Sequence, residues 1–78
     1  MGSEFAAIDL EATGRRIRRL REGRGLSVPQ IRDALQISSV QAVYKWERGE
    51  NLPNIDNLYA LSRLFGVRID EMLVQEVR

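Results

Sequence analysis

The stretch that decides the fold is residues 27–49, which read SVPQIRDALQISSVQAVYKWERG. It contains two short segments in which apolar residues recur every three or four positions, the spacing that places side chains on one face of a helix. In the first segment the inward-facing residues are Val28, Ile31, Ala34 and Leu35. In the second segment they are Val43 and Trp46. The stretch therefore predicts two short helices, over about 28–35 and 39–48, joined by a tight turn.

Capping residues mark where these two helices begin. Ser27 and Gln30 form a capping-box pattern at the start of the first helix, in which each side chain binds the backbone N–H of the other residue. The second helix follows two serines, Ser38 and Ser39, and either one can act as its N-cap. A cap at Ser38 would form a capping box with Gln41 and tie that side chain to the helix end. A cap at Ser39 leaves Gln41 free.

The rest of the chain has the same helical periodicity and no strand-like alternation of useful length. We predict a helix over about 11–22, a fourth helix after the N-cap residue Asn54, whose regular apolar face begins at Ile55, and a last short helix over about 69–74. The tail through Arg78 is expected to fray. The fold class is therefore an all-α, compact five-helix domain. Its predicted core is Ile17, Leu20, Ile31, Leu35, Val43, Trp46, Leu58, Leu61, Leu64 and Phe65.

The length and composition of the chain limit its possible functions. Its 78 residues are enough for a single domain. Residues 1–5 (MGSEF) resemble expression-vector sequence, so we assign this domain to residues 6–78. The chain has no cysteine and no histidine, which excludes disulfides and removes the commonest metal ligand and general base. We therefore expect no enzyme activity, no metal and no cofactor. No apolar stretch approaches the roughly 20 residues that cross a bilayer, so we expect a cytoplasmic protein with no membrane partner.

The positive charges are gathered in the middle of the chain. The net charge is only +1, but residues 15–48 hold nine bases and three acids, and eight of the bases are arginine. Arginine pairs well with phosphate oxygens, so this block fits a nucleic-acid partner. A solvated, arginine-rich helix face fits it equally well, and charge alone does not decide between the two.

Several short segments in this order resemble one family, the Cro and phage-repressor type (Xre family) helix-turn-helix regulators, over about residues 13–74. The segments are GRRIRRLR at 14–21, GLS at 25–27, YKWERG at 44–49, LP at 52–53, IDNL at 55–58, LFGV at 64–67 and IDE at 69–71. The resemblance implies a phage-repressor-like domain of five helices, in which the second and third form the helix-turn-helix and the third, about 39–48, lies in the major groove of double-stranded DNA. It also favours Ser39 as the cap of that helix.

The resemblance assigns roles to particular residues. Early residues of the third helix contact bases, and here these are Val40, Gln41, Ala42, Tyr44 and Lys45. Of these, Gln41 suits adenine and Lys45 suits guanine, whereas Val40 and Ala42 offer only apolar contact with a thymine methyl. The implied phosphate contacts are Ser27, Ser39, Arg48, Asn51 and Asn54. Arg21 and Glu47 are expected to form an ion pair between the first and third helices.

Two positions depart from the family pattern. The family often places glutamine where this chain has Val28, at the start of the second helix, and glycine in the turn where this chain has Gln36. The turn is also one residue longer than usual.

Two hypotheses about function follow. The first is a sequence-specific DNA-binding domain of a transcriptional regulator, acting as a homodimer on a two-fold operator, with a further C-terminal domain not included here. The second is a protein-interaction or antitoxin-type module that uses the same fold to bind a partner protein. Met72, Leu73, Val74 and Val77 either form a dimer contact or complete the core.

Overall fold

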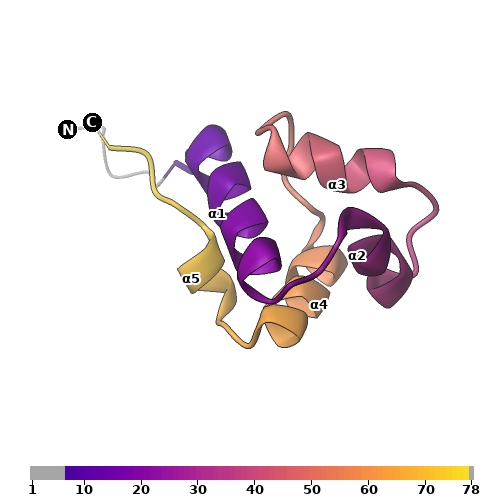
Figure 1. Ribbon diagram of the computed structural model, residues 1–78. Helices are drawn as coiled ribbons and strands as arrows, with labels where there is room; N and C mark the ends of the chain where they lie inside the picture. Colours follow the sequence, from indigo (N-terminus) through magenta and orange to yellow (C-terminus); the bar gives the residue numbers. More distant parts are fainter. Residues whose placement is uncertain (1–6, 78) are drawn as a thin grey trace.

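The computed structural model describes residues 7–77 and consists of five helices (Figure 1). Their bounds are α1 (Leu10–Gly23), α2 (Val28–Leu35), α3 (Val40–Glu47), α4 (Ile55–Phe65) and α5 (Ile69–Met72). The predicted all-α, five-helix fold is therefore confirmed. Residues 1–5, interpreted as vector sequence, lie outside the described residues. Within residues 7–77, no helix is long and apolar enough to cross a membrane.

Side-chain caps define the starts of the first four helices. Asp9, Ser27, Ser39 and Asn54 each accept a hydrogen bond from a backbone N–H in the first turn. The expected capping box is present at α2, where the Ser27 N–H donates to Gln30 Oε1 at 2.7 Å and the Gln30 N–H donates to Ser27 Oγ at 3.2 Å. At α3 the cap is Ser39, not Ser38, and its Oγ accepts from the Gln41 N–H at 3.0 Å.

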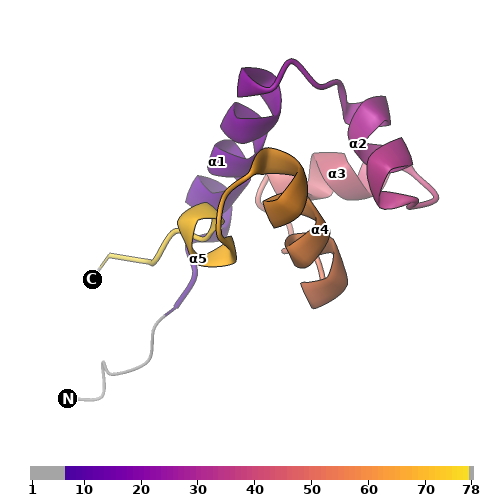
Figure 2. The ribbon, with the colours of Figure 1, turned by 90° about the horizontal axis from the view of Figure 1, so that it is seen from below.

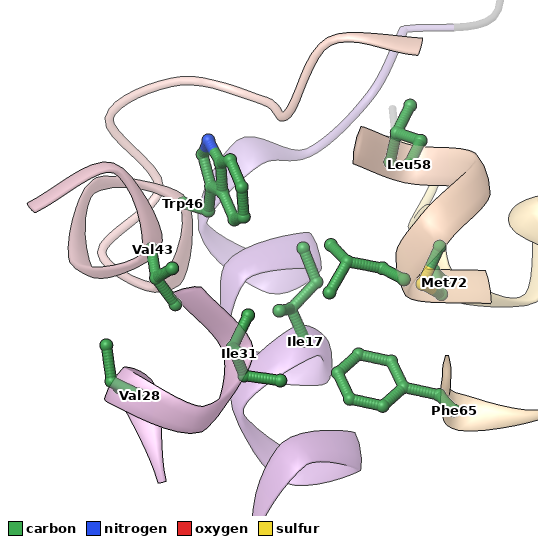
Figure 3. Close-up of a cluster of buried hydrophobic side chains, with 9 residues drawn as sticks. Ile17, Val28, Ile31, Val43, Trp46, Leu58, Phe65 and Met72 are labelled. Atoms are coloured by element: carbon green, nitrogen blue, oxygen red, sulfur yellow. The ribbon is translucent and has the colours of Figure 1, made fainter. Parts of the chain in front are cut away.

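The core lies where the inward faces of all five helices meet (Figure 3). Trp46 points from α3 toward the same interior as Ile17 of α1 and Phe65 of α4, and it is 5% exposed. The fully or nearly fully buried apolar residues are Ile17, Val28, Ile31, Val43, Trp46, Leu58, Leu61, Phe65 and Met72. Of the four residues expected either to form a dimer contact or to complete the core, Met72 completes the core and Leu73 packs against it, whereas Val77 is 92% exposed.

Several expected core residues lie elsewhere. Leu20, Leu35 and Leu64 are only partly buried and pack against the rim of the core. Ala34 is exposed, because α2 turns only its Val28 and Ile31 side fully inward. Ile55 continues the apolar spacing of α4, yet 69% of its surface is exposed. It is the first residue of α4, and the inward face of that helix begins to be covered only at Leu58.

The chain after α5 does not fray as expected over the described residues. It runs antiparallel to the residues before α1: the Asp9 N–H donates to the Val74 carbonyl at 2.8 Å, and the Glu76 N–H donates to the Ala7 carbonyl at 2.7 Å. The Val74 N–H also donates to Thr13 Oγ1 at 2.9 Å, which gives this fully buried hydroxyl a partner. These bonds fasten the C-terminal segment to the first turn of α1.

Candidate nucleic-acid interface

The outward face of α3 carries a polar row. Gln41, Tyr44 and Lys45 are exposed at the surface, while Val43 and Trp46 on the opposite face are buried. This separation follows from the helical period, because positions three and four apart share a face. Among the described residues, no carboxylate forms an ion pair with Lys45, so its ammonium group remains available to a ligand. The side chains in this row provide amide, hydroxyl and ammonium donors.

Two of the five expected base-contacting residues do not belong to this row. Val40 and Ala42 are partly buried and pack against the core. Their positions on α3 turn them toward the neighbouring helices, so neither side chain projects as Gln41 does. The structure therefore brings together Gln41, Tyr44 and Lys45 and leaves Val40 and Ala42 as packing residues.

A buried ion pair fixes the C-terminal end of α3 to α1. Arg21 Nε donates to Glu47 Oε2 at 2.7 Å and Arg21 Nη2 donates to Glu47 Oε1 at 3.1 Å, so the contact is bidentate. Only 13% of the Arg21 side chain and 7% of the Glu47 side chain are exposed. The hydrogen bond from Arg21 to Glu47 raises the pKa of the guanidinium above its ordinary value, against the opposing effect of burial. A third donor of Arg21, Nη1, binds the Leu26 carbonyl at 2.9 Å and so holds the segment before α2.

A glycine allows α1 and α3 to approach this closely. A Cβ atom at Gly14 would overlap the Trp46 carbonyl oxygen and would lie 2.6 Å from the Glu47 carbonyl oxygen. Both oxygens belong to the backbone at the end of α3, so neither can rotate away. The close packing of α1 on α3 therefore requires glycine at this position.

Three of the five expected phosphate contacts are the N-caps of α2, α3 and α4. Ser27, Ser39 and Asn54 each use a side-chain oxygen to accept a backbone N–H. A serine hydroxyl keeps its hydrogen when its oxygen accepts, and an asparagine amide keeps two N–H donors. All three caps thus still have donors for an anion, beside helix N-termini that carry partial positive charge.

The linker after α3 contains the other two expected phosphate contacts. Arg48 is already paired, because its Nε donates to Glu50 Oε2 at 2.6 Å. That hydrogen bond lowers the pKa of the Glu50 carboxyl below its ordinary value. Both side chains are about half exposed, so a phosphate can compete with Glu50 for the guanidinium. Asn51 is exposed and, among the described residues, has no side-chain hydrogen bond.

The arginines of α1 and its C-cap are partly used within the fold. Arg16 donates to the Glu71 carbonyl at 2.9 Å, and Arg24 donates to the Phe65 carbonyl at 2.7 Å, so each binds a carbonyl at or near the end of another helix. Arg18 pairs with Glu22 one turn along α1. Over the described part of the chain, only Arg15 and Arg19 of α1 lack such partners. Most of the basic block is therefore paired within the fold, and its unpaired cations are Arg15 and Arg19 on α1 and Lys45 on α3, within the described residues.

The geometry matches a helix-turn-helix, and comparison with known proteins agrees. A family model described as helix-turn-helix matches residues 17–72. The chain belongs to the Xre/Cro-type helix-turn-helix family. This family consists of DNA-binding domains of transcriptional regulators and not of enzymes.

Similar proteins of this family are known in sequence and in structure. The HTH-type transcriptional activator BcrR of Enterococcus faecalis is 38% identical over 61 residues, which are 78% of this chain. The chain spans only 29% of that activator's length. The P22 c2 repressor, solved in complex with a synthetic operator, is 33% identical with a TM-score of 0.73, over 78% of this chain and 91% of that one. The restriction-modification controller protein C.AhdI from Aeromonas hydrophila is 26% identical with a TM-score of 0.73, over 82% of this chain and 96% of that one.

Two residues near the site were missed by sequence reasoning. The role of Gly14 depends on Trp46 and Glu47, which lie more than 30 positions away in the sequence. Glu50 lies two residues after Arg48, and this spacing in a linker could have suggested that the two charges pair. Both residues act on α3 or its flank and do not extend the polar row.

Proposed function

We propose that Gln41 and Lys45 read base edges in the major groove, with Tyr44 beside them at a base or a phosphate. A glutamine amide can bind adenine with two hydrogen bonds, and a lysine ammonium can donate to the acceptors of guanine. The observation that supports this proposal is the orientation of α3, whose amide and ammonium groups face solvent while Trp46 is buried behind them.

We assign the caps and the linker a positioning role. Donors on Ser27, Ser39 and Asn54 would bind phosphate oxygens, joined by Asn51 and by Arg48 once it releases Glu50. Contacts of this kind orient a domain on the duplex without carrying sequence information. They also release counterions, so log affinity should fall steeply and linearly with log salt.

We further propose that two copies bind a two-fold operator. Symmetric pairing would place two α3 helices in successive major grooves about 34 Å apart. One eight-residue helix offers few base contacts, so a single domain is expected to bind weakly and a pair more tightly.

The test begins with selection of a binding site from random duplexes, followed by titrations of variants against that site. We expect Gln41→Ala and Lys45→Ala each to lower specific affinity by about 1–3 kcal/mol, with discrimination lost at one base position for each. The matched control is Arg19→Ala, which removes an unpaired cation from α1 and should weaken binding to all duplexes slightly and alike. If both α3 variants bind the selected site as the parent does, α3 is not the reading helix.

A further inference from the structure

The first turns of α1 are in backbone contact with the end of α3 and with the linker that follows it. Gly14 faces the carbonyl groups at the end of α3, as described above. Gly49 in the linker stands similarly close to Glu11, because a Cβ atom at Gly49 would lie 2.7 Å from the Glu11 Cα and 3.0 Å from its nitrogen. Contacts between backbone atoms are not relieved by side-chain rotation. A shift of the first turns of α1 is therefore transmitted to residues 46–49.

The segment after α5 binds the same turns of α1. The Val74 N–H donates to Thr13 Oγ1 at 2.9 Å, and the Val74 carbonyl accepts from the Asp9 N–H at 2.8 Å. Asp9 is the N-cap of α1, and its side chain accepts from the Ala12 N–H at 2.9 Å. Figure 2 shows this segment passing the start of α1. Both backbone polar groups of Val74 thus bind α1 or its cap.

Thr13 is the residue at which these two sets of contacts meet. It directly precedes Gly14 in the sequence, and its side chain is fully buried, so bulk water does not reach its hydroxyl in place of Val74. Without the hydroxyl, Val74 would keep its carbonyl bond to the cap and lose its bond to the helix. A partly buried N–H that loses its acceptor costs more free energy than the bond itself contributes.

We propose that Thr13, through its hydrogen bond to Val74, positions the C-terminal end of α3 and the linker for contact with DNA. Thr13 itself touches no duplex. It fixes the first turns of α1, and their backbone in turn fixes residues 46–49. Lys45, assigned above to a base, directly precedes these residues, and Arg48, assigned to a phosphate, is one of them. The effect on DNA rests on the proposed function, whereas the effect on the packing of α3 does not depend on DNA.

The expected displacement decreases along α3 toward its N-terminus. Lys45 is next to the backbone that contacts Gly14, whereas Gln41 lies near the other end of the helix. A shift of the C-terminal end therefore disturbs the contact of Lys45 first. Trp46 lies at the same end and is the only tryptophan of the chain, so a single indole N–H resonance reports the position of this end without DNA.

Two substitutions remove the bond from its opposite ends. Thr13→Val nearly keeps the shape of the side chain and removes the acceptor, while Val74→Pro removes the donor. Proline is compatible with the backbone at this position, because Leu73 before it is extended, with φ −82° and ψ 134°. Each variant should lower the melting temperature by roughly 5 °C or more. Each should also shift the Trp46 indole N–H resonance by more than its linewidth.

Two further variants separate positioning from stability. Thr13→Ser keeps the hydroxyl, so its Trp46 indole resonance should stay close to that of the parent. Val67→Ala is the matched control, because Val67 packs against the core in the turn between α4 and α5. Loss of its two methyl groups should lower the melting temperature by a similar amount and leave the indole resonance in place.

DNA binding is then measured with the selected site, at a temperature at which every variant is folded. Thr13→Val and Val74→Pro should each reduce discrimination at the base read by Lys45 roughly threefold or more. Their effect at the base read by Gln41 should be smaller. Thr13→Ser and Val67→Ala should discriminate within about twofold of the parent at both bases.

The melting, resonance and binding data together decide the inference. If Thr13→Val is destabilised but keeps the indole resonance and the discrimination of the parent, the hydroxyl only stabilises the fold and the inference is overturned. An unchanged melting temperature, or a control that alters the resonance and the discrimination as much as Thr13→Val does, overturns it as well. If the parent binds no selected duplex, the proposed function fails, and the indole resonance alone decides whether Thr13 positions α3.

Discussion

Replacing Gly14 with alanine sets two effects of opposite sign against each other. Helix propensity favours alanine over glycine in a helix interior by about 1 kcal/mol. Against this, the added Cβ would lie 2.6 Å from the Glu47 carbonyl oxygen and 2.9 Å from its carbonyl carbon, and would overlap the Trp46 carbonyl oxygen. These atoms belong to the backbone, so relief requires α3 to move away from α1, and overpacking of this kind costs about 1–3 kcal/mol. That movement also stretches the Arg21–Glu47 pair, so we expect a net loss of about 1–2 kcal/mol.

A second glycine in the same helix provides the control. A Cβ at Gly23, the last residue of α1, meets no atom within 4 Å. Gly23→Ala should therefore show only the conformational effect and gain about 0.5 kcal/mol. Urea titrations of the parent and both variants measure these differences, and melting temperatures should move in opposite directions by several degrees. If Gly14→Ala stabilises the domain as Gly23→Ala does, α1 and α3 do not pack at Gly14 as closely as described above.

Three further changes have defined outcomes. Glu47→Ala leaves the Arg21 guanidinium buried without its carboxylate and should lower the free energy of unfolding, measured by urea titration, by about 3–5 kcal/mol. The double variant Arg21→Met with Glu47→Leu should recover most of that loss. A loss below about 1 kcal/mol for Glu47→Ala would contradict the buried ion pair. Gln36 has a φ of 57°, so Gln36→Gly should stabilise the domain by up to about 1 kcal/mol, and a decrease in melting temperature would argue against that conformation. Glu50→Gln frees Arg48 and should tighten DNA binding and steepen the salt dependence by about one unit of slope, and an unchanged slope would mean that Arg48 meets no phosphate. Because the pKa of Glu50 is lowered from 4.5, its pairing persists above that value and is lost only as pH falls through the lower one, so this difference in DNA binding should be the same at about pH 7 and pH 5.

Much of the fold was predictable because its determinants are local. The caps at Ser27 and Asn54 bind N–H groups three residues away, so a sequence pattern is enough to find them. The outward position of Gln41 and Lys45 likewise follows from the helical period once Trp46 is assigned to the core. These features depend only on residues within one or two turns of each other.

The features that sequence reasoning missed depend on neighbours distant in the chain. Ile55 fits the apolar spacing of α4, but its side chain is exposed. The spacing alone does not show at which residue neighbouring helices stop covering the apolar face of α4. The last helix was predicted to reach about residue 74 and the tail beyond it to fray, whereas α5 ends at Met72 and the following segment bonds to Ala7 and Asp9, more than 60 residues earlier. Gly14 costs stability when only helix propensity is considered, and the carbonyls that require it belong to α3.

The contacts that hold α3 against α1 lie at one end of the helix. A substitution outside the site can therefore displace one part of α3 more than another. Its ties to α1, at Gly14 and Arg21, both engage residues 46–47 at its C-terminal end. Gln41 lies six residues from Glu47, roughly 9 Å along the helix. The Cβ added by Gly14→Ala pushes on residues 46–47 themselves, so the displacement of α3 is largest at that end, beside Lys45, and smaller at Gln41. Gly14→Ala should accordingly impair discrimination at the base read by Lys45 more than at the base read by Gln41. Equal loss at both positions would mean that α3 shifts as a whole.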